Sequence, residues 1–144
     1  MTIAIGSDHG GYELKLKLIE HIKELGHEVK DLGCHSKESC DYPIYGHAVG
    51  KDMAEGKSDL GVVVCTSGIG ISIAANKVPG IRAALCTNEF MAKMTRLHNN
   101  ANVLALGANV VGPGLAEAIL DTFLSTEFSG EERHERRVRE IEEL

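Results

Sequence analysis

The sequence contains no tryptophan and only three phenylalanines and three tyrosines among its 144 residues. A core must therefore be built mainly from valine, isoleucine, leucine and alanine. Long apolar runs are missing as well, because no stretch approaches the roughly 20 residues that a membrane-spanning helix requires, and we expect no membrane partner. Residues 1–6 lack the basic segment that opens a signal peptide, so we expect a cytoplasmic protein.

An excess of positive charge is also absent. The chain has 15 Lys and Arg against 21 Asp and Glu, a formal net charge of −6. Nonspecific nucleic-acid binding draws on a positive surface, so we expect no nucleic-acid partner. The cysteines are too scattered for a disulfide framework and match no zinc-ligand spacing, so we predict reduced thiols and no metal site; they are Cys34, Cys40, Cys65 and Cys86.

Apolar patterning predicts a single domain over residues 1–144. Strands are expected at residues 2–6, 28–32, 60–65, 81–86 and 103–106, and helices at residues 13–25, 43–54, 71–76, 89–97 and 114–125. This alternation predicts an α/β fold, a three-layer α/β/α domain with a mostly parallel five-stranded sheet of Rossmann-like kind. A charged C-terminal helix over 131–144 has no core stripe of its own. It should lie on the surface or against another subunit.

In open parallel sheets, ligands bind at the carboxyl ends of the strands. That rule selects three places: Asp8 and His9 after the first strand, residues 65–70 after the third, and the polar residues near Cys86. Asp8 and His9 could perform acid–base work, or Asp8 could simply cap a helix.

Cys65 ends the most apolar strand and precedes a turn that opens a helix. Backbone N–H groups there stabilise a thiolate, but a buried cysteine can equally be inert, and position alone favours neither reading. The turn Thr66–Gly70 adds two hydroxyls and two glycines, which suit an anion-binding nest beside the sulfur. A dinucleotide fingerprint fails because Ile73 replaces its third glycine, and a phosphatase loop fails because Ile71 replaces its arginine.

Two further clusters are open to a structural or a functional reading. His98-Asn99-Asn100 ends a predicted helix, where a histidine usually serves as a cap, although it could act as a general acid. Arg133 and Arg137 are four residues apart and could hold one phosphate together, yet the interleaved glutamates favour ordinary ion pairs.

Together, these pieces resemble one family, the type B ribose-5-phosphate isomerases and their sugar-phosphate isomerase relatives. The resemblance follows the chain in order over nearly its whole length and rests on Ser7-Asp8-His9-Gly10-Gly11, Asp41-Tyr42-Pro43, Cys65–Lys77, Gly80–Ala84, His98–Val103 and Arg133-His134. It implies interconversion of an aldose and a ketose phosphate through an enediolate, without metal or organic cofactor, in the pentose phosphate pathway.

The resemblance also implies a catalytic centre. Cys65 matches the base, and Ser67 matches a hydroxyl that assists at the reacting carbonyl. One branch of the family carries a glutamate base where this chain has Ile71, so the proton transfer would fall to Cys65. The anion hole for the enediolate oxygen matches the backbone of Gly68, Ile69, Gly70, Ile71 and Ser72.

The remaining matches concern ring opening and binding. Asp8 and His98 match residues that open the furanose ring, and Asn99 matches a sugar contact. The phosphate ligands match His9, Arg133 and Arg137. The family's pocket lies between subunits, one giving Cys65 and the other His98, which implies a homodimer or homotetramer with shared sites.

Three departures from the family pattern stand out. Thr66 replaces a more usual glycine, Glu131-Glu132 replaces Gly-Gly, and Asn109 replaces an arginine that helps to hold the phosphate. Ribose 5-phosphate is the expected substrate. The alternatives are a six-carbon substrate, allose 6-phosphate or galactose 6-phosphate, and a sugar-phosphate binding protein without catalysis.

Overall fold

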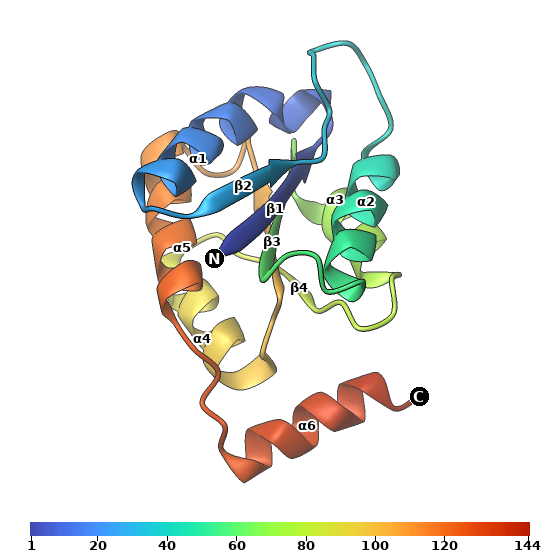
Figure 1. Ribbon diagram of the computed structural model, residues 1–144, viewed down its shortest axis with the longest axis vertical. Helices are drawn as coiled ribbons and strands as arrows, with labels where there is room; N and C mark the ends of the chain where they lie inside the picture. Colours follow the sequence, from blue (N-terminus) through green and yellow to red (C-terminus); the bar gives the residue numbers. More distant parts are fainter.

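The computed structural model describes residues 1–144 and confirms the predicted α/β class (Figure 1). Five parallel strands form one sheet in the order β2-β1-β3-β5-β4. Their bounds are β1 Thr2–Ser7, β2 Glu28–Asp31, β3 Leu60–Cys65, β4 Ala83–Leu85 and β5 Val103–Gly107.

Helices α1 to α5 lie in two layers, one on each face of the sheet (Figure 1). Helices α1, α4 and α5 cover one face, and α2 and α3 cover the other. A 3-10 turn, His9–Gly11, precedes α1, and the helices are α1 Tyr12–Glu24, α2 Tyr42–Ala54, α3 Ile69–Asn76, α4 Glu89–Asn99, α5 Pro113–Ser125 and α6 Glu132–Glu142. None of them is long and apolar enough to span a membrane.

Successive strand residues supply the two cores in turn. In β3, Val62 and Val64 belong to the cluster under α1, α4 and α5, whereas Val63 and Cys65 belong to the cluster under α2 and α3. This follows from the two-residue period of a strand, because neighbouring side chains point to opposite faces. Both clusters are aliphatic, and Phe123 is the single aromatic ring in them. The side chain of Cys65 therefore points toward α2 and α3.

Four predicted boundaries were wrong by two residues. Two of them are helix ends, because α4 runs to Asn99 rather than residue 97 and α6 ends at Glu142 rather than residue 144. The fourth strand begins at Ala83 rather than residue 81, because the Ile81 N–H bonds to the Val78 carbonyl in a turn. Helix α3 begins at Ile69 rather than residue 71, after Gly68 in a left-handed conformation at φ 78°. The earlier start brings the first turn of α3 directly against the end of β3.

Helix α6 lies on the surface, as expected for a helix without a core stripe. Only His134 of this helix is buried, and its neighbour in the fold is α4. In Figure 1, α6 lies at the end of the molecule where α4 finishes, away from the carboxyl ends of β1 and β3.

Candidate active site

Asp8 and Cys65 lie side by side at the point where the strand order reverses. Ser7 and Val64 are paired across β1 and β3, and the Asp8 N–H donates to the Val64 carbonyl at 3.3 Å. The chain runs outward from β1 to β2 on one side and continues from β3 on the other. Such a switch point opens a crevice at the carboxyl ends of the two strands, which is the usual ligand position in open α/β sheets.

The Cys65 sulfur is buried and held by the loop that follows it. The Gly68 N–H donates to Sγ at 3.1 Å, and the Cys65 carbonyl accepts from the Ala108 N–H at 2.8 Å. This hydrogen bond fixes the sulfur against the turn that opens α3.

The first turn of α3 leaves two amides without a partner. The Ile69 N–H donates to Ser67 Oγ at 3.2 Å, and the Ser72 N–H donates to the Gly68 carbonyl at 3.2 Å. The N–H groups of Gly70 and Ile71 have no hydrogen-bond acceptor in the chain. Unpaired amides at a helix N-terminus bind anions, so Gly70 and Ile71 are the available donors of the predicted anion hole.

Asp8 is buried and caps the turn that leads into α1. Its Oδ1 accepts from the Gly11 N–H at 3.1 Å, so the structural reading of Asp8 as a cap is correct. The cap leaves the second carboxylate oxygen, Oδ2, with no partner in the chain. Asp8 can therefore hold the turn and still offer an oxygen to a sugar hydroxyl.

Gly68 cannot accept a side chain. A Cβ atom at this position would lie 2.6 Å from the Leu85 side chain and 2.8 Å from the Gly107 nitrogen, and the positive φ adds strain. We expect Gly68→Ala to lower the free energy of unfolding by about 1–3 kcal/mol and to reduce turnover, because the anion-hole amides shift with it. Urea unfolding measures the first effect and a kinetic assay the second.

Gly114 offers the matched control, because nothing lies within 4 Å of a Cβ built there and it stands in the first turn of α5. Gly114→Ala should leave turnover unchanged and stabilise the fold by up to about 1 kcal/mol. Equal stability of the two variants would contradict the close packing of Gly68.

His9 and Asn109 flank the Cys65 turn. His9 is exposed, and its Nδ1 accepts from the Cys40 N–H at 3.2 Å. Asn109 is held by its backbone, whose N–H donates to the Thr66 carbonyl at 3.0 Å. Asn109 and Gly10 line a hollow of about 170 Å³ with Lys17. The position that usually carries an arginine thus lies at the same edge of the sheet as Cys65.

His98 and Asn99 lie at the other end of the sheet. Arg82 donates to the Asn99 carbonyl at 3.1 Å and, through its backbone N–H, to the Asn102 side chain at 2.8 Å. The Asn102 carbonyl in turn accepts from the N–H of Gly61, near the start of β3. Four residues separate Gly61 from Cys65, which is roughly 13 Å along a strand. One chain therefore does not bring His98 and Cys65 together.

Arg133 and Arg137 share this distant end with His98. His134, between them on α6, stacks on His98 with ring centroids 4.3 Å apart and accepts or donates a 2.8 Å hydrogen bond with Ser129 Oγ. Burial, followed by the neighbouring His98 and Arg133, holds the pKa of His134 below its usual value. The neutral His134 packs α6 against α4. This packing places Arg133 and Arg137, which lie on the same helix, at the end of the sheet where His98 lies.

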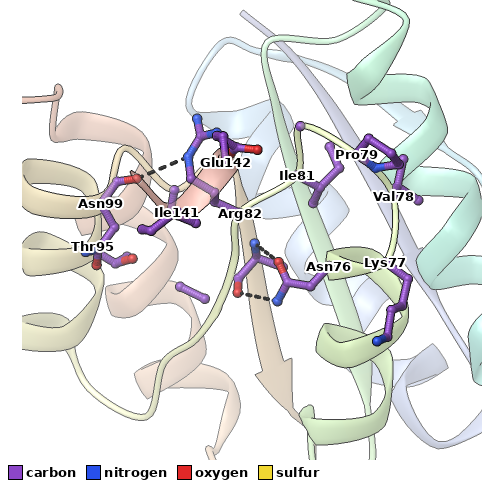
Figure 2. Close-up of a pocket in the computed structure, with 14 residues that line it drawn as sticks. Asn76, Lys77, Val78, Pro79, Ile81, Arg82, Thr95, Asn99, Ile141 and Glu142 are labelled. Carbon is purple, nitrogen blue, oxygen red and sulfur yellow. Dashed lines mark hydrogen bonds and ion pairs between the residues drawn. The ribbon is translucent and has the colours of Figure 1, made fainter. Parts of the chain in front are cut away.

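A hollow of about 520 Å³ lies at this same end, between α4, α6 and the loop after α3 (Figure 2). Figure 2 shows Arg82 reaching from the middle of it toward Asn99 and Glu142, while Asn76 binds the backbone of β4. Asn99 is the only predicted site residue in its lining. Cys65, Ser67 and Asp8 are absent from it.

Two residues near the site carried no role in the sequence analysis. A Cβ atom on Gly70 would lie 2.6 Å from the Tyr42 ring, so Tyr42 covers the first turn of α3. Lys15 is fully buried under the loop that follows β2 and pairs with Asp31 at 2.7 Å. A lysine in an amphipathic helix is ordinarily solvated, and no local signal marks this one as buried.

Apolar side chains are exposed around the Cys65 end of α2 and α3. Ile69 and Ile73 share one face of α3 and are 54% and 55% exposed, and Ile44 on α2 is 59% exposed. Elsewhere, no three His, Cys, Asp or Glu side chains gather in a way that could hold a metal ion. An apolar patch beside an incomplete site is typical of a protein–protein interface.

Comparison with known proteins gives a consistent result. Residues 3–141 match the family described as Ribose/Galactose Isomerase. Ribose-5-phosphate isomerase B of Escherichia coli K12 is 46% identical over 139 residues, covering 96% of this chain and 93% of the relative. Galactose-6-phosphate isomerase subunit LacB of Clostridium acetobutylicum is 41% identical over 144 residues, covering all of this chain and 83% of the relative.

A solved structure is similar over almost the full length. Ribose-5-phosphate isomerase B of Clostridium thermocellum superimposes with a TM-score of 0.98 at 56% identity and covers 99% of this chain and 96% of the other. The corresponding protein of Thermotoga maritima gives a TM-score of 0.96 at 49% identity, covering 99% and 98% of the two chains.

Proposed function

The chain belongs to the ribose/galactose isomerase family and is a sugar-phosphate isomerase, and from this premise we propose that it interconverts ribose 5-phosphate and ribulose 5-phosphate. The observation that carries the proposal is that the Cys65 sulfur accepts the Gly68 N–H at the start of α3, the helix whose Gly70 and Ile71 N–H groups have no acceptor in the chain. A base next to an oxyanion-binding turn is what proton transfer through an enediolate requires.

The reaction moves one proton between neighbouring carbons. The Cys65 thiolate removes the proton from C2 of the open-chain aldose, and the electron pair forms the C1–C2 double bond of the enediolate. The amides of Gly70 and Ile71 stabilise the negative oxygen, and the Ser67 hydroxyl assists the proton exchange between O1 and O2. The Cys65 thiol then returns a proton to C1, which leaves the ketone at C2.

We propose that a second copy of the chain completes each site. His98 opens the sugar ring together with Asp8 of the first copy, while Asn99, Arg133 and Arg137 bind the sugar and its phosphate. The exposed isoleucines around α2 and α3 support a homodimer or a homotetramer of such pairs, because burying them removes apolar area from water.

A substrate panel tests the choice of sugar. We expect kcat/KM for ribose 5-phosphate to exceed that for allose 6-phosphate and galactose 6-phosphate by about tenfold or more, since one extra carbon in a fitted pocket costs roughly this much. A preference for a six-carbon phosphate would replace the proposed substrate. That alternative has its own support in Asn109 and in the galactose-6-phosphate isomerase relative.

A binding protein without catalysis is the remaining alternative. An isomerase exchanges the migrating proton with solvent, whereas a binding protein does not. We expect ribose 5-phosphate labelled with deuterium at C2 to lose its label to water in the presence of the protein. Retention of the label after prolonged incubation would favour the binding protein without catalysis.

Asn109→Arg should improve phosphate binding. The side chain at 109 is exposed at the Cys65 end, and a guanidinium there adds a charge-assisted contact. A contact of about 1.5–3 kcal/mol lowers KM for ribose 5-phosphate by about tenfold or more, with little change in kcat. Steady-state kinetics measure both constants, and Asn109→Gln provides a neutral control of similar length. An unchanged KM would place the phosphate elsewhere.

A further inference from the structure

His9 is held by a segment that follows β2. The backbone N–H of Cys40, in residues 32–41, donates to His9 Nδ1 at 3.2 Å. Only a nitrogen lone pair can accept this bond, so Nδ1 carries no proton. The proton of the neutral imidazole is therefore on Nε2, because the hydrogen bond at one ring nitrogen sets the tautomer of the other. His9 is exposed at the Cys65 end, and its Nε2–H has no partner in the chain.

The start of the same segment is fixed by a buried ammonium group. Lys15 is 0% exposed, and its Nζ donates to Asp31 Oδ1 at 2.7 Å and to the Cys34 carbonyl at 2.5 Å. Asp31 Oδ1 also accepts from the Gly33 N–H at 3.0 Å. A buried ammonium is unfavourable unless it is fully paired. Loss of one of these contacts therefore costs more free energy than loss of a surface ion pair.

The anchored part of the segment is paired with the end of β1. The Ser7 N–H donates to the Gly33 carbonyl at 2.7 Å, and the Cys34 N–H donates to the Ser7 carbonyl at 2.7 Å. Ser7 immediately precedes Asp8 and His9. Residues 32–41 therefore contact the His9 region at both ends, through Ser7 at the start and through the imidazole at Cys40.

We propose that residues 32–41 are a positioning element for His9, anchored by Lys15, in which the Cys40 amide holds the imidazole as an Nε2–H donor toward the substrate. The proposal rests on the proposed function, because it takes His9 as a ligand of the phosphorylated sugar. It assigns His9 to binding rather than to proton transfer. An imidazole whose Nδ1 is occupied and whose Nε2 is protonated donates a hydrogen bond but does not remove a proton from carbon.

A matched pair of variants isolates the amide. Cys40→Pro and Cys40→Ala both remove the thiol, but only proline removes the N–H. We expect KM for ribose 5-phosphate to be about tenfold higher in Cys40→Pro than in Cys40→Ala, with kcat differing by less than about threefold, because a lost binding contact acts on substrate affinity. Equal KM values in the two folded variants would overturn the proposal.

The tautomer of His9 can be read without any variant of the segment. In protein labelled with ¹⁵N at histidine, the His9 signals are those missing from His9→Gln, and their shifts identify the protonated nitrogen. We expect the Nε2–H tautomer in the wild type, and a predominant Nδ1–H tautomer would overturn the proposal even if Cys40→Pro fails to fold. This readout needs no turnover, so it separates failure of the positioning element from failure of the proposed function.

The role of Lys15 as the anchor of residues 32–41 is tested with a second lysine variant as the control. Lys15→Met should shift the His9 tautomer population and raise KM as Cys40→Pro does, because the Cys34 carbonyl and Asp31 lose their shared partner. Lys30→Met removes a different lysine, whose ammonium pairs with Asp52 on α2 at 2.8 Å. A folded Lys15→Met with the wild-type tautomer and KM would remove Lys15 from the positioning element.

Discussion

Replacing Cys65 with alanine is expected to lower kcat for ribose 5-phosphate by about 10²–10⁴-fold, the range that a positioned general base contributes. KM should change little, because the change leaves the proposed phosphate ligands and the proposed anion-hole amides in place. The sulfur accepts the Gly68 N–H at 3.1 Å and is the only thiol at the end of β3. Release of deuterium from C2 of labelled substrate reports the proton transfer itself and should fall by the same factor.

Cys86 provides the control for the loss of a buried thiol. It is free and buried in the opposite core cluster, and burial raises the pKa of its thiol to about 11, so it stays neutral near pH 7. Cys86→Ala should retain turnover. Near-normal turnover in Cys65→Ala would transfer the proton step to another residue and remove the mechanism argued above.

The second large effect concerns two inactive variants that should rescue each other. Cys65→Ala and His98→Asn, each expected to lose about 10²-fold or more in turnover, alter residues at opposite ends of the sheet. After mixing, unfolding and refolding in equal amounts, half of the dimers are hybrids, and each hybrid has one site with both residues intact. Specific activity should therefore return to roughly a quarter of the wild-type value for a symmetric shared-site dimer.

A mixture of Cys65→Ala with Ser67→Ala is the control, because both changes lie in the same half-site and no hybrid contains an intact centre. This mixture should show no rescue. If Cys65→Ala and His98→Asn give only the average of their separate activities, each chain completes its own site and the proposed sharing between copies fails.

Local patterning predicted the layered fold well. The apolar runs that become β1, β3 and β5 were found because each strand is buried on both faces, which leaves no polar residue to interrupt the run. The start of α3 was predicted two residues late, because it depends on the left-handed backbone of Gly68 and on the Ile69 N–H that donates to Ser67 Oγ, neither of which apolar periodicity records. The start of β4 was predicted too early for a similar reason, because the Ile81 N–H bonds to the Val78 carbonyl in a turn and not to a neighbouring strand.

The candidate site could be predicted only where it follows a strand. Asp8 and Cys65 are linked by the rule for carboxyl ends, but their adjacency required the strand order, which places β1 next to β3. The separation of His98 from Cys65 could not be read from spacing, because it depends on the direction in which α4 runs back along the sheet. Lys15 was missed for another reason: its partners Asp31 and Cys34 are distant in sequence and form no motif.

The distance between Cys65 and His98 within one chain has a consequence for kinetics under the proposed sharing of sites between copies. If each centre needs two copies, the number of working centres follows the association equilibrium rather than the amount of protein added. Specific activity would then decline on dilution and recover on concentration, and its midpoint would report the dissociation constant of the pair. The dependence of specific activity on protein concentration would thus measure the association of two copies.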